Sequence, residues 1–271
     1  MKKLLISLLL LVGGSAIFVF GSPYYSVFPT NGNLLYCLAL AFFFLILAIV
    51  FRLVKSWVSY WPAAYALFTA SAALLFLNTG LLNLHNPRMP DLQYLAFDKL
   101  SQFLHVVPVI LLLTLPVKDR LKSIFLKRGN LKQGLLFGLI SFAVFALIAI
   151  LIGSFSGNEI TSLLMAAPWI LIFIFCNAIM EELWFRAIFL KSYELLIGRI
   201  AAILVTALVF GASHINVTYE FPGGGVVFGI VVFGLGVAGA WSMFKTDSLI
   251  GALLFHAGYD LVIIGSVLNT L

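Results

Sequence analysis

The chain contains 271 residues, of which 63% are hydrophobic and only 10% are charged. Soluble domains are roughly 45–50% apolar and about 25% charged, so this composition excludes a water-soluble fold. The formal net charge of +6 comes from basic residues in short loops between apolar stretches, as in membrane proteins, and nucleic acid is therefore excluded as a partner. We predict an all-α, polytopic transmembrane helical bundle embedded in the lipid bilayer.

Long apolar stretches are the main structural signal along the chain. A helix needs about 20 apolar residues to cross the hydrocarbon core of a bilayer. By that criterion we predict about nine membrane-spanning helices, at residues 4–20, 34–54, 61–82, 100–116, 133–153, 163–190, 200–218, 226–244 and 249–269. A signal peptide cleaved from residues 1–21 is the competing interpretation of the first stretch, but the length of that stretch favours a retained helix.

The basic residues divide unevenly between the two sides of these predicted helices, and Lys and Arg are enriched in cytoplasmic loops. The predicted inner segments hold Lys2, Lys3, Arg52, Lys55, Lys118, Arg120, Lys122, Lys127, Arg128, Lys132, Lys191, Arg199 and Lys245. The predicted outer loops hold only Arg88 and Lys99, and Arg186 falls inside a span. We therefore predict an N-terminus inside and a C-terminus outside, in what we expect to be a bacterial cell membrane.

The basic loop at 117–132 is the clearest internal boundary. We predict an N-terminal four-helix extension at 1–116, a basic cytoplasmic loop at 117–132, and a C-terminal five-helix core at 133–271. Anionic lipids of the inner leaflet attract basic segments of this kind.

Ionisable residues inside the predicted spans are the functional signal, because a charge within hydrocarbon costs about 2.5–3.5 kcal/mol by insertion measurements. In the first half of the chain the exception is His105, which we interpret as a packed, hydrogen-bonded structural residue. The second half contributes Glu181, Glu182, Arg186, His214, His256 and Asp260 from three predicted helices. Convergence of this kind predicts a buried polar site, because isolated charges facing lipid would have no compensation.

The first polar cluster lies on one predicted helix. Glu182 and Arg186 are four residues apart, so they can pair on one face of that helix. Glu181 is rotated by about 100° from Glu182 and is not aligned with the arginine. A carboxylate without a paired cation in a low-dielectric cavity becomes more basic, so Glu181 is the better candidate for a general base. A structural polar knot between helices is the alternative interpretation.

The second and third clusters contain histidine. Small residues precede His214, and His256 shares a helix face with Asp260, which could orient it. Counting from the nearest basic residues places Glu181 and His256 at one depth in the membrane, and His214 about 8 Å away from it. We therefore expect an interfacial turn or a tilt at the start of the helix that carries His214.

Small residues are concentrated in the predicted span 226–244 and its edge. Gly225 and Gly229 form a small-xxx-small pair, and Gly234, Gly236, Ala238 and Gly239 follow. Such residues let two helix backbones approach closely in a membrane. We predict a close helix–helix seam here, rather than a substrate slot.

The three clusters together form an ordered set of motifs: Glu181-Glu182-x-x-x-Arg186, Phe210-x-x-x-His214 and His256-x-x-x-Asp260. This set resembles the CPBP family, which comprises the CAAX prenyl endopeptidases and the bacteriocin-processing or abortive-infection membrane proteins. The resemblance covers about residues 130–271 and implies intramembrane proteolysis.

By this resemblance, Glu181 and His214 would activate a water for attack on a peptide carbonyl. His256 and Asp260 would stabilise the oxyanion, with Glu182, Arg186 and Phe210 in support. The last family motif often ends in asparagine. Asp260 departs from it, because an ionised aspartate only accepts hydrogen bonds.

The same residues pose the question of a metal. Two histidines and a carboxylate match the ligand set of a catalytic zinc site, which would use Glu181, His214 and His256. We favour a cofactor-free mechanism, in which glutamate activates the water. The expected substrate is a membrane-associated protein or peptide, with prenylated CAAX-type segments as one candidate class.

Two other classes of function remain as alternatives. A non-catalytic scaffold or bacteriocin-immunity-type protein would keep these residues for packing. A proton-coupled transporter would use intramembrane Glu and His for coupling, but it predicts paired broken helices or repeated halves, and the polar residues here lie in one half of the chain. The sequence leaves the substrate, the oligomeric state and the role of the first four helices open.

Overall fold

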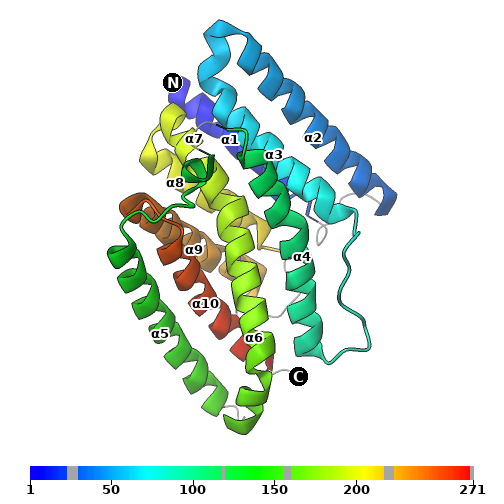
Figure 1. Cartoon of the computed structure of the whole chain (residues 1–271), viewed down its shortest axis with the longest axis vertical. Helices are drawn as coiled ribbons and strands as arrows, with labels where there is room; N and C mark the ends of the chain where they lie inside the picture. The colour runs from blue at the N-terminus through cyan, green and yellow to red at the C-terminus, as the bar shows by residue number, and fades with distance from the viewer. Residues whose placement is uncertain (23–29, 118–119, 156–159, 217–222, 269–271) are drawn as a thin grey trace.

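The computed structural model describes residues 1–22, 30–117, 120–155, 160–216 and 223–268, and within these ranges it is helical and contains no strand (Figure 1). The α-helices are α1 (Lys2–Phe18), α2 (Thr30–Leu53), α3 (Trp61–Asn78), α4 (Asp91–Thr114), α5 (Leu131–Phe155), α6 (Ile160–Glu181), α7 (Ile188–Ile197), α8 (Arg199–Ser213), α9 (Gly224–Thr246) and α10 (Ile250–Leu268). Short 3-10 helices lie at η1 (Lys55–Tyr60) and η2 (Arg120–Ile124), and a π-helix, η3 (Glu182–Ala187), joins α6 to α7. The prediction of an all-α fold is confirmed.

Each predicted span coincides with a helix, but the helices differ in length. Within the described ranges, six helical segments are long and apolar enough to cross a membrane: Asn33–Leu53, Lys55–Asn78, Asp91–Thr114, Leu131–Leu151, Met165–Ile197 and Gly224–Thr246. The helix α8 has 15 residues, which gives it a length of about 22 Å against about 30 Å of hydrocarbon. The chain is an integral membrane protein, and the count of about nine crossings stays a prediction.

The helices pack as a bundle in which segments from both halves of the chain interleave. α2 lies along α3, α5 along α10, α8 along α9, and α4 along α6 (Figure 1). The first helix, α1, packs against α8 and α7, so the N-terminal part contacts the C-terminal part directly. The predicted division of the chain into an extension at 1–116, a loop at 117–132 and a core at 133–271 stays a prediction.

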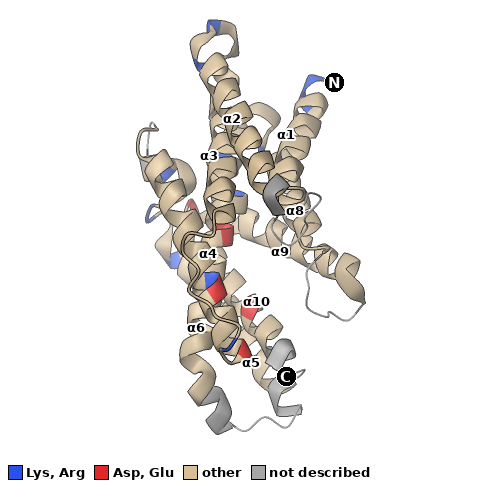
Figure 2. Cartoon of the chain, turned by 90° about the vertical axis from the view of Figure 1, so that its right-hand side faces the viewer, with Lys and Arg blue, Asp and Glu red and all other residues tan. Residues whose placement is uncertain are grey.

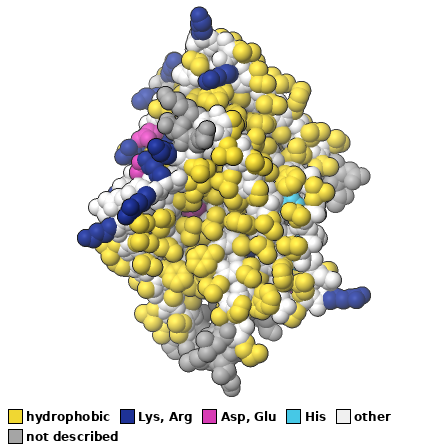
Figure 3. Space-filling model, viewed as in Figure 1, with side chains coloured by type: hydrophobic (Ala, Val, Ile, Leu, Met, Phe, Trp, Pro, Cys, Tyr) yellow, Lys and Arg dark blue, Asp and Glu magenta, His cyan; other side chains and the backbone are white. Residues whose placement is uncertain are grey.

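The surface of the bundle has the character of a membrane protein. Apolar side chains cover most of the face seen in Figure 3, and Lys and Arg lie at its margins. Figure 2 shows basic residues at the start of α1 and at the loop between α2 and α3, at the same end of the bundle. The start of α1 and the end of α10 lie at opposite ends of the bundle (Figure 1). Which end faces the cytoplasm stays a prediction.

His105 has the structural role that we expected. It is 2% exposed; its Nδ1 donates to the Ser101 carbonyl at 2.7 Å, and its Nε2 accepts the Leu82 backbone N–H at 3.0 Å. Both ring nitrogens are therefore engaged in holding the segment after α3 against α4.

The predicted glycine seam joins α9 to α8. A Cβ atom on Gly211 would lie 2.6 Å from the Gly229 carbonyl oxygen, and one on Gly229 would lie 2.9 Å from the Gly211 carbonyl oxygen. Real Cβ atoms do not approach backbone oxygen so closely, so the two backbones are in contact at this point. The expectation of a close helix–helix seam is confirmed.

We expect Gly229→Val to lower the free energy of unfolding by about 1–3 kcal/mol, the usual cost of overpacking a close contact. Gly234→Val is the matched control on the same helix, because a Cβ atom at Gly234 meets nothing within 4 Å. Thermal unfolding of the two variants in one detergent would measure the difference. Equal melting temperatures for the two variants would contradict the seam.

An ion-pair cluster at the end of α9 ties the basic loop to the bundle. Asp247 pairs with Lys127 and, at 3.1 Å, with Lys191 on α7. The Lys191 ammonium also donates to the Lys122 carbonyl at 2.6 Å. Burial alone would raise the pKa of the Asp247 carboxyl, but the hydrogen bonds and charges of Lys127 and Lys191 outweigh it and hold that pKa below its ordinary value.

This lowered pKa gives a signed pH dependence. A carboxyl with a depressed folded-state pKa stabilises the fold at neutral pH, and that contribution is lost as the pH falls through the folded-state value. We expect Asp247→Asn to lower stability at pH 7 by about 1 kcal/mol or less, because the pair is half-exposed. Asparagine tolerates the left-handed backbone at this position. Melting curves of the two proteins should converge on acidification, and a constant gap would contradict the assignment.

Candidate active site

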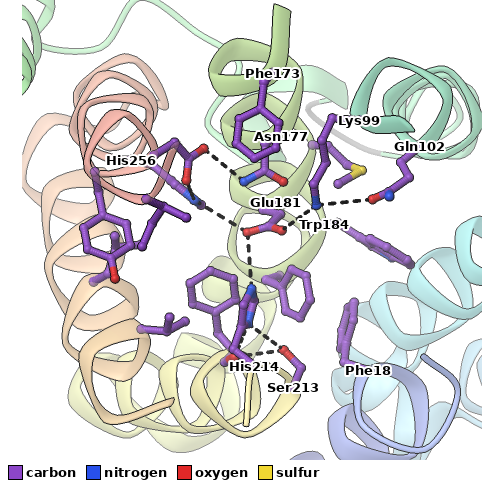
Figure 4. A pocket seen from close by; sticks show the side chains of 18 of the residues that line it. Phe18, Lys99, Gln102, Phe173, Asn177, Glu181, Trp184, Ser213, His214 and His256 are labelled. Carbon is purple, nitrogen blue, oxygen red and sulfur yellow. Dashed lines mark hydrogen bonds and ion pairs between the residues drawn. The ribbon is translucent and has the colours of Figure 1, made fainter. Parts of the chain in front are cut away.

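A cavity of about 200 Å³ lies near the middle of the bundle, between helices from both halves of the chain. Its lining is mostly apolar, with aromatic side chains such as Phe18, Trp184 and Phe228. Ionisable side chains point into it at one place, around Glu181 (Figure 4). The predicted polar site and the cavity therefore coincide.

Glu181 is the central residue of this arrangement. It is the last residue of α6 and is 6% exposed. Its Oε2 atom lies 3.5 Å from Nε2 of His256 and 3.8 Å from Nε2 of His214 (Figure 4). Side chains from α6, from the end of α8 and from α10 thus meet at one carboxylate oxygen.

The hydrogen bonds of the two histidines fix which nitrogen carries the proton. Nδ1 of His214 lies 2.8 Å from the carbonyl oxygen of Phe210, which can only accept, so this nitrogen donates. Nδ1 of His256 lies 2.7 Å from Oε1 of Glu182 and donates to that carboxylate. In its neutral form each imidazole then presents an Nε2 lone pair toward Glu181.

The predicted pair of Glu182 and Arg186 is present and fully buried. Nε of Arg186 donates to Oε2 of Glu182 at 2.7 Å, Nη2 donates to Oε1, and both side chains are 0% exposed. The guanidinium also lies over the Phe210 ring at 4.1 Å, a cation–π contact. A Cβ atom on Gly239 would lie 3.2 Å from Oε2 of Glu182, so this glycine lets α9 pack against the pair.

The backbone at this pair is not an ordinary α-helix. Residues Glu182–Ala187 form the π-helix η3, which starts directly after Glu181. π-Helical turns are rare and occur often at functional sites. This feature was not predicted from the sequence, because regular α-helical spacing was assumed.

Asp260 is held by a residue that the sequence analysis missed. Nδ2 of Asn177 donates to Oδ2 of Asp260 at 3.0 Å, and Oδ1 of Asp260 lies 3.6 Å from Nε2 of His256. Asn177 is 6% exposed and lies one helical turn before Glu181 on α6. An amide four residues before the candidate base, inside an apolar span, is the signal that could have identified it.

Lys99 was assigned to an outer loop, and this assignment is wrong. The helix α4 begins at Asp91, nine residues earlier than the predicted span, so Lys99 lies within it. Its ammonium is 4.0 Å from Oε1 of Glu181 and donates to Oε1 of Gln102 at 3.5 Å (Figure 4). The spacing of Lys99 and Gln102, on one face of a helix, is a sequence signal for its position.

The donor types at Glu181, His214 and His256 match those of a catalytic zinc site. Among the described residues, however, no group of three His, Cys, Asp or Glu side chains is arranged so that it could hold a metal ion. The mechanism proposed below therefore uses no metal.

The C-terminal half of the chain is similar to a known protein family. Residues 162–262 match the family model described as type II CAAX prenyl endopeptidase Rce1-like. This segment is therefore similar to the Rce1-like family. The Rce1-like segment contains Glu181, His214, His256 and Asp260, and it excludes Lys99. No curated protein and no solved structure matches the chain.

Proposed function

We propose that the protein is an intramembrane endopeptidase, which hydrolyses peptide bonds of membrane-associated substrates with a water activated by Glu181 and His214. The main observation in support is that two imidazole Nε2 atoms face the same carboxylate oxygen of Glu181 within a buried cavity. A carboxylate and two imidazole lone pairs are acceptors, and together they can orient a water and take its proton.

The proposed steps follow from these positions. Glu181 takes a proton from the water as the water oxygen bonds to the substrate carbonyl carbon, and the carbonyl π electrons move to oxygen. The C–N bond then breaks, and the proton passes from Glu181 to the leaving nitrogen. The products are a carboxyl and an amine, so atoms and charge balance.

The surroundings of Glu181 support a role as base. Glu182 is already paired with Arg186, and it fixes His256 through Nδ1. Glu182 therefore has its acceptor oxygens occupied, whereas the contacts of Glu181 with the two histidines and Lys99, among the residues that the structure describes, are long, at 3.5, 3.8 and 4.0 Å. The two neighbouring glutamates are thus suited to different tasks, one structural and one catalytic.

Prenylated CAAX-type segments are the first substrate class to test, because the family description names this activity. The apolar lining of the cavity suits a substrate that arrives from the bilayer or from the inner face. Unmodified membrane peptides belong in the same test, since the lining alone does not distinguish them.

The test is cleavage of a panel of fluorogenic membrane-associated peptides, prenylated and unmodified, by the purified full chain in lipid. Wild type, Glu181→Ala and Glu194→Ala are compared with and without a chelator. Glu194 is a suitable control because it pairs with Arg199 at 2.8 Å, and neither residue lines the cavity.

We expect turnover by wild type and Glu194→Ala, loss of turnover in Glu181→Ala, and no effect of the chelator. Inhibition by the chelator would indicate that zinc, rather than glutamate alone, activates the water. Undiminished activity in Glu181→Ala would reject the assignment of the base. A panel that remains uncut by wild type would favour a non-catalytic scaffold.

A further inference from the structure

Hydrolysis of a peptide bond creates a negative charge on the carbonyl oxygen, and the groups around Glu181 differ in whether they can stabilise it. Each neutral histidine has given its Nδ1 proton to another acceptor and offers only a lone pair at Nε2. If His256 were protonated, its second N–H would face the carboxylates of Glu181 and Asp260. Neither histidine is therefore a donor directed at substrate.

Most of the remaining polar groups near Glu181 are also engaged. An ionised Asp260 only accepts hydrogen bonds, and the Asn177 amide donates to it. The Gln102 amide donates to Asp98 at 2.7 Å, and the Ser213 hydroxyl donates to the Phe210 carbonyl at 2.8 Å. Apart from the neutral hydroxyl of Tyr259, these contacts leave the oxyanion without a donor from the side chains on α6 and α10.

Lys99 differs from these groups because it is basic. Within the described part of the chain, it is the only Lys or Arg among the residues that line the cavity. Its side chain is 19% exposed and approaches Oε1 of Glu181, opposite to the histidines, which face Oε2 (Figure 4). An ammonium has three N–H donors and no acceptor; that of Lys99 lies 4.0 Å from Oε1 of Glu181 and donates to Oε1 of Gln102 at 3.5 Å.

We propose that Lys99 is a catalytic residue of this enzyme, whose ammonium donates a hydrogen bond to the oxyanion formed when water attacks the peptide carbonyl. This inference rests on the proposed endopeptidase function. A fixed positive charge in a water-poor cavity stabilises developing negative charge far more than it would in bulk water. As the carbonyl π electrons move to oxygen, the ammonium keeps its protons and the attacking water loses one to Glu181.

This role makes an N-terminal helix part of the active site. The helix α4 packs along α6, which holds Lys99 at the level of Glu181. Lys99 lies outside residues 162–262, so the Rce1-like segment alone would lack this donor. The extension would then contribute to the chemistry as well as to packing.

The test compares Lys99→Met and Lys99→Arg in the full chain, with a substrate that wild type cleaves. Methionine keeps a long apolar side chain without the charge, and arginine keeps the charge. Lys245→Met is the control, because Lys245 lies at the end of α9 over the Trp241 ring at 4.5 Å and does not line the cavity.

We expect Lys99→Met to lower the plateau kcat of the pH–rate profile by about 10²–10³-fold, the usual effect of losing one oxyanion donor. KM should change much less, Lys99→Arg should recover part of the rate, and melting temperatures should stay close to wild type. The Lys245→Met control should match wild type in every respect.

Three outcomes would overturn the role of Lys99. If Lys99→Met recovers the full plateau rate at higher pH, the lysine only keeps Glu181 ionised. If the plateau is unchanged and Tyr259→Phe instead loses activity, the donor is the Tyr259 hydroxyl, which is buried without a hydrogen-bond partner. If wild type cleaves no substrate at all, the endopeptidase function fails and this role fails with it.

Discussion

His256→Ala and His214→Ala are each expected to lower kcat by about 10²–10⁴-fold, the range for loss of a group that handles protons in the transition state. Both imidazoles direct Nε2 at one oxygen of Glu181, so each variant removes one of the two acceptors that orient the water. Because the three residues act as a unit, either histidine variant combined with Glu181→Ala should cost little more than Glu181→Ala alone. The measurement is single-turnover cleavage by purified variants.

His85→Ala is the matched control for these histidine variants. His85 lies before α4, 3.6 Å from Asp98, and it does not line the cavity. It should leave kcat unchanged. Losses that are fully additive between His256→Ala and Glu181→Ala would argue against a shared water.

The second large effect concerns stability. Glu182→Gln should lower the free energy of unfolding by about 3–5 kcal/mol, because it leaves the buried Arg186 charge without its partner. Replacing both residues, as in Glu182→Gln with Arg186→Met, should cost less than the sum of the single changes, since no isolated charge remains.

Thermal unfolding in detergent measures these differences. Glu194→Gln provides the control, because it breaks the more exposed pair with Arg199 and should cost about 0–1 kcal/mol. A Glu182→Gln protein as stable as Glu194→Gln would show that Arg186 finds other compensation, for example from the Phe210 ring.

Much of the fold followed from composition, because an apolar stretch of about 20 residues has few structural options in a membrane. The pairing of Glu182 with Arg186 also followed from the sequence, because residues four apart share one face of a helix. The convergence of Glu181, His214 and His256 was predicted from the cost of isolated charges in hydrocarbon. Their distances from one another depend on how three helices pack, which no local pattern contains.

Residue counting misjudged the depth of His214. It assumed that Lys191 and Arg199 mark the same membrane level, but α7 continues to Ile197. Measured from the turn at Gly198, Glu181 lies 17 residues before and His214 lies 16 residues after, so both are at one depth. The 8 Å offset therefore came from the wrong reference point, and no unusual turn is needed to remove it.

The two missed residues, Lys99 and Asn177, share a cause. Lys99 was counted as a loop charge because the apolar stretch used for the span begins at residue 100, whereas the helix starts at Asp91. Asn177 carries no charge, so a search for ionisable residues passed over it. Polar residues at the edge of a span, or uncharged ones within it, need the neighbouring helices before their role can be seen.

The π-helix between α6 and α7 decides how this segment responds to a change in its length. A π-turn holds one residue more than the α-helical turn that it replaces, so deleting one residue between Glu182 and Arg186 would let the helix close into regular α geometry. The turn would still close a full circle, so α7 would keep its orientation relative to α6, and Arg186 would stay on the face of Glu182 as an i,i+3 pair. A deletion in the regular helix α7 before Lys191 would instead rotate everything beyond it by about 100°, and Lys191 would leave Asp247. The loss of one residue should thus be better tolerated within η3 than within α7.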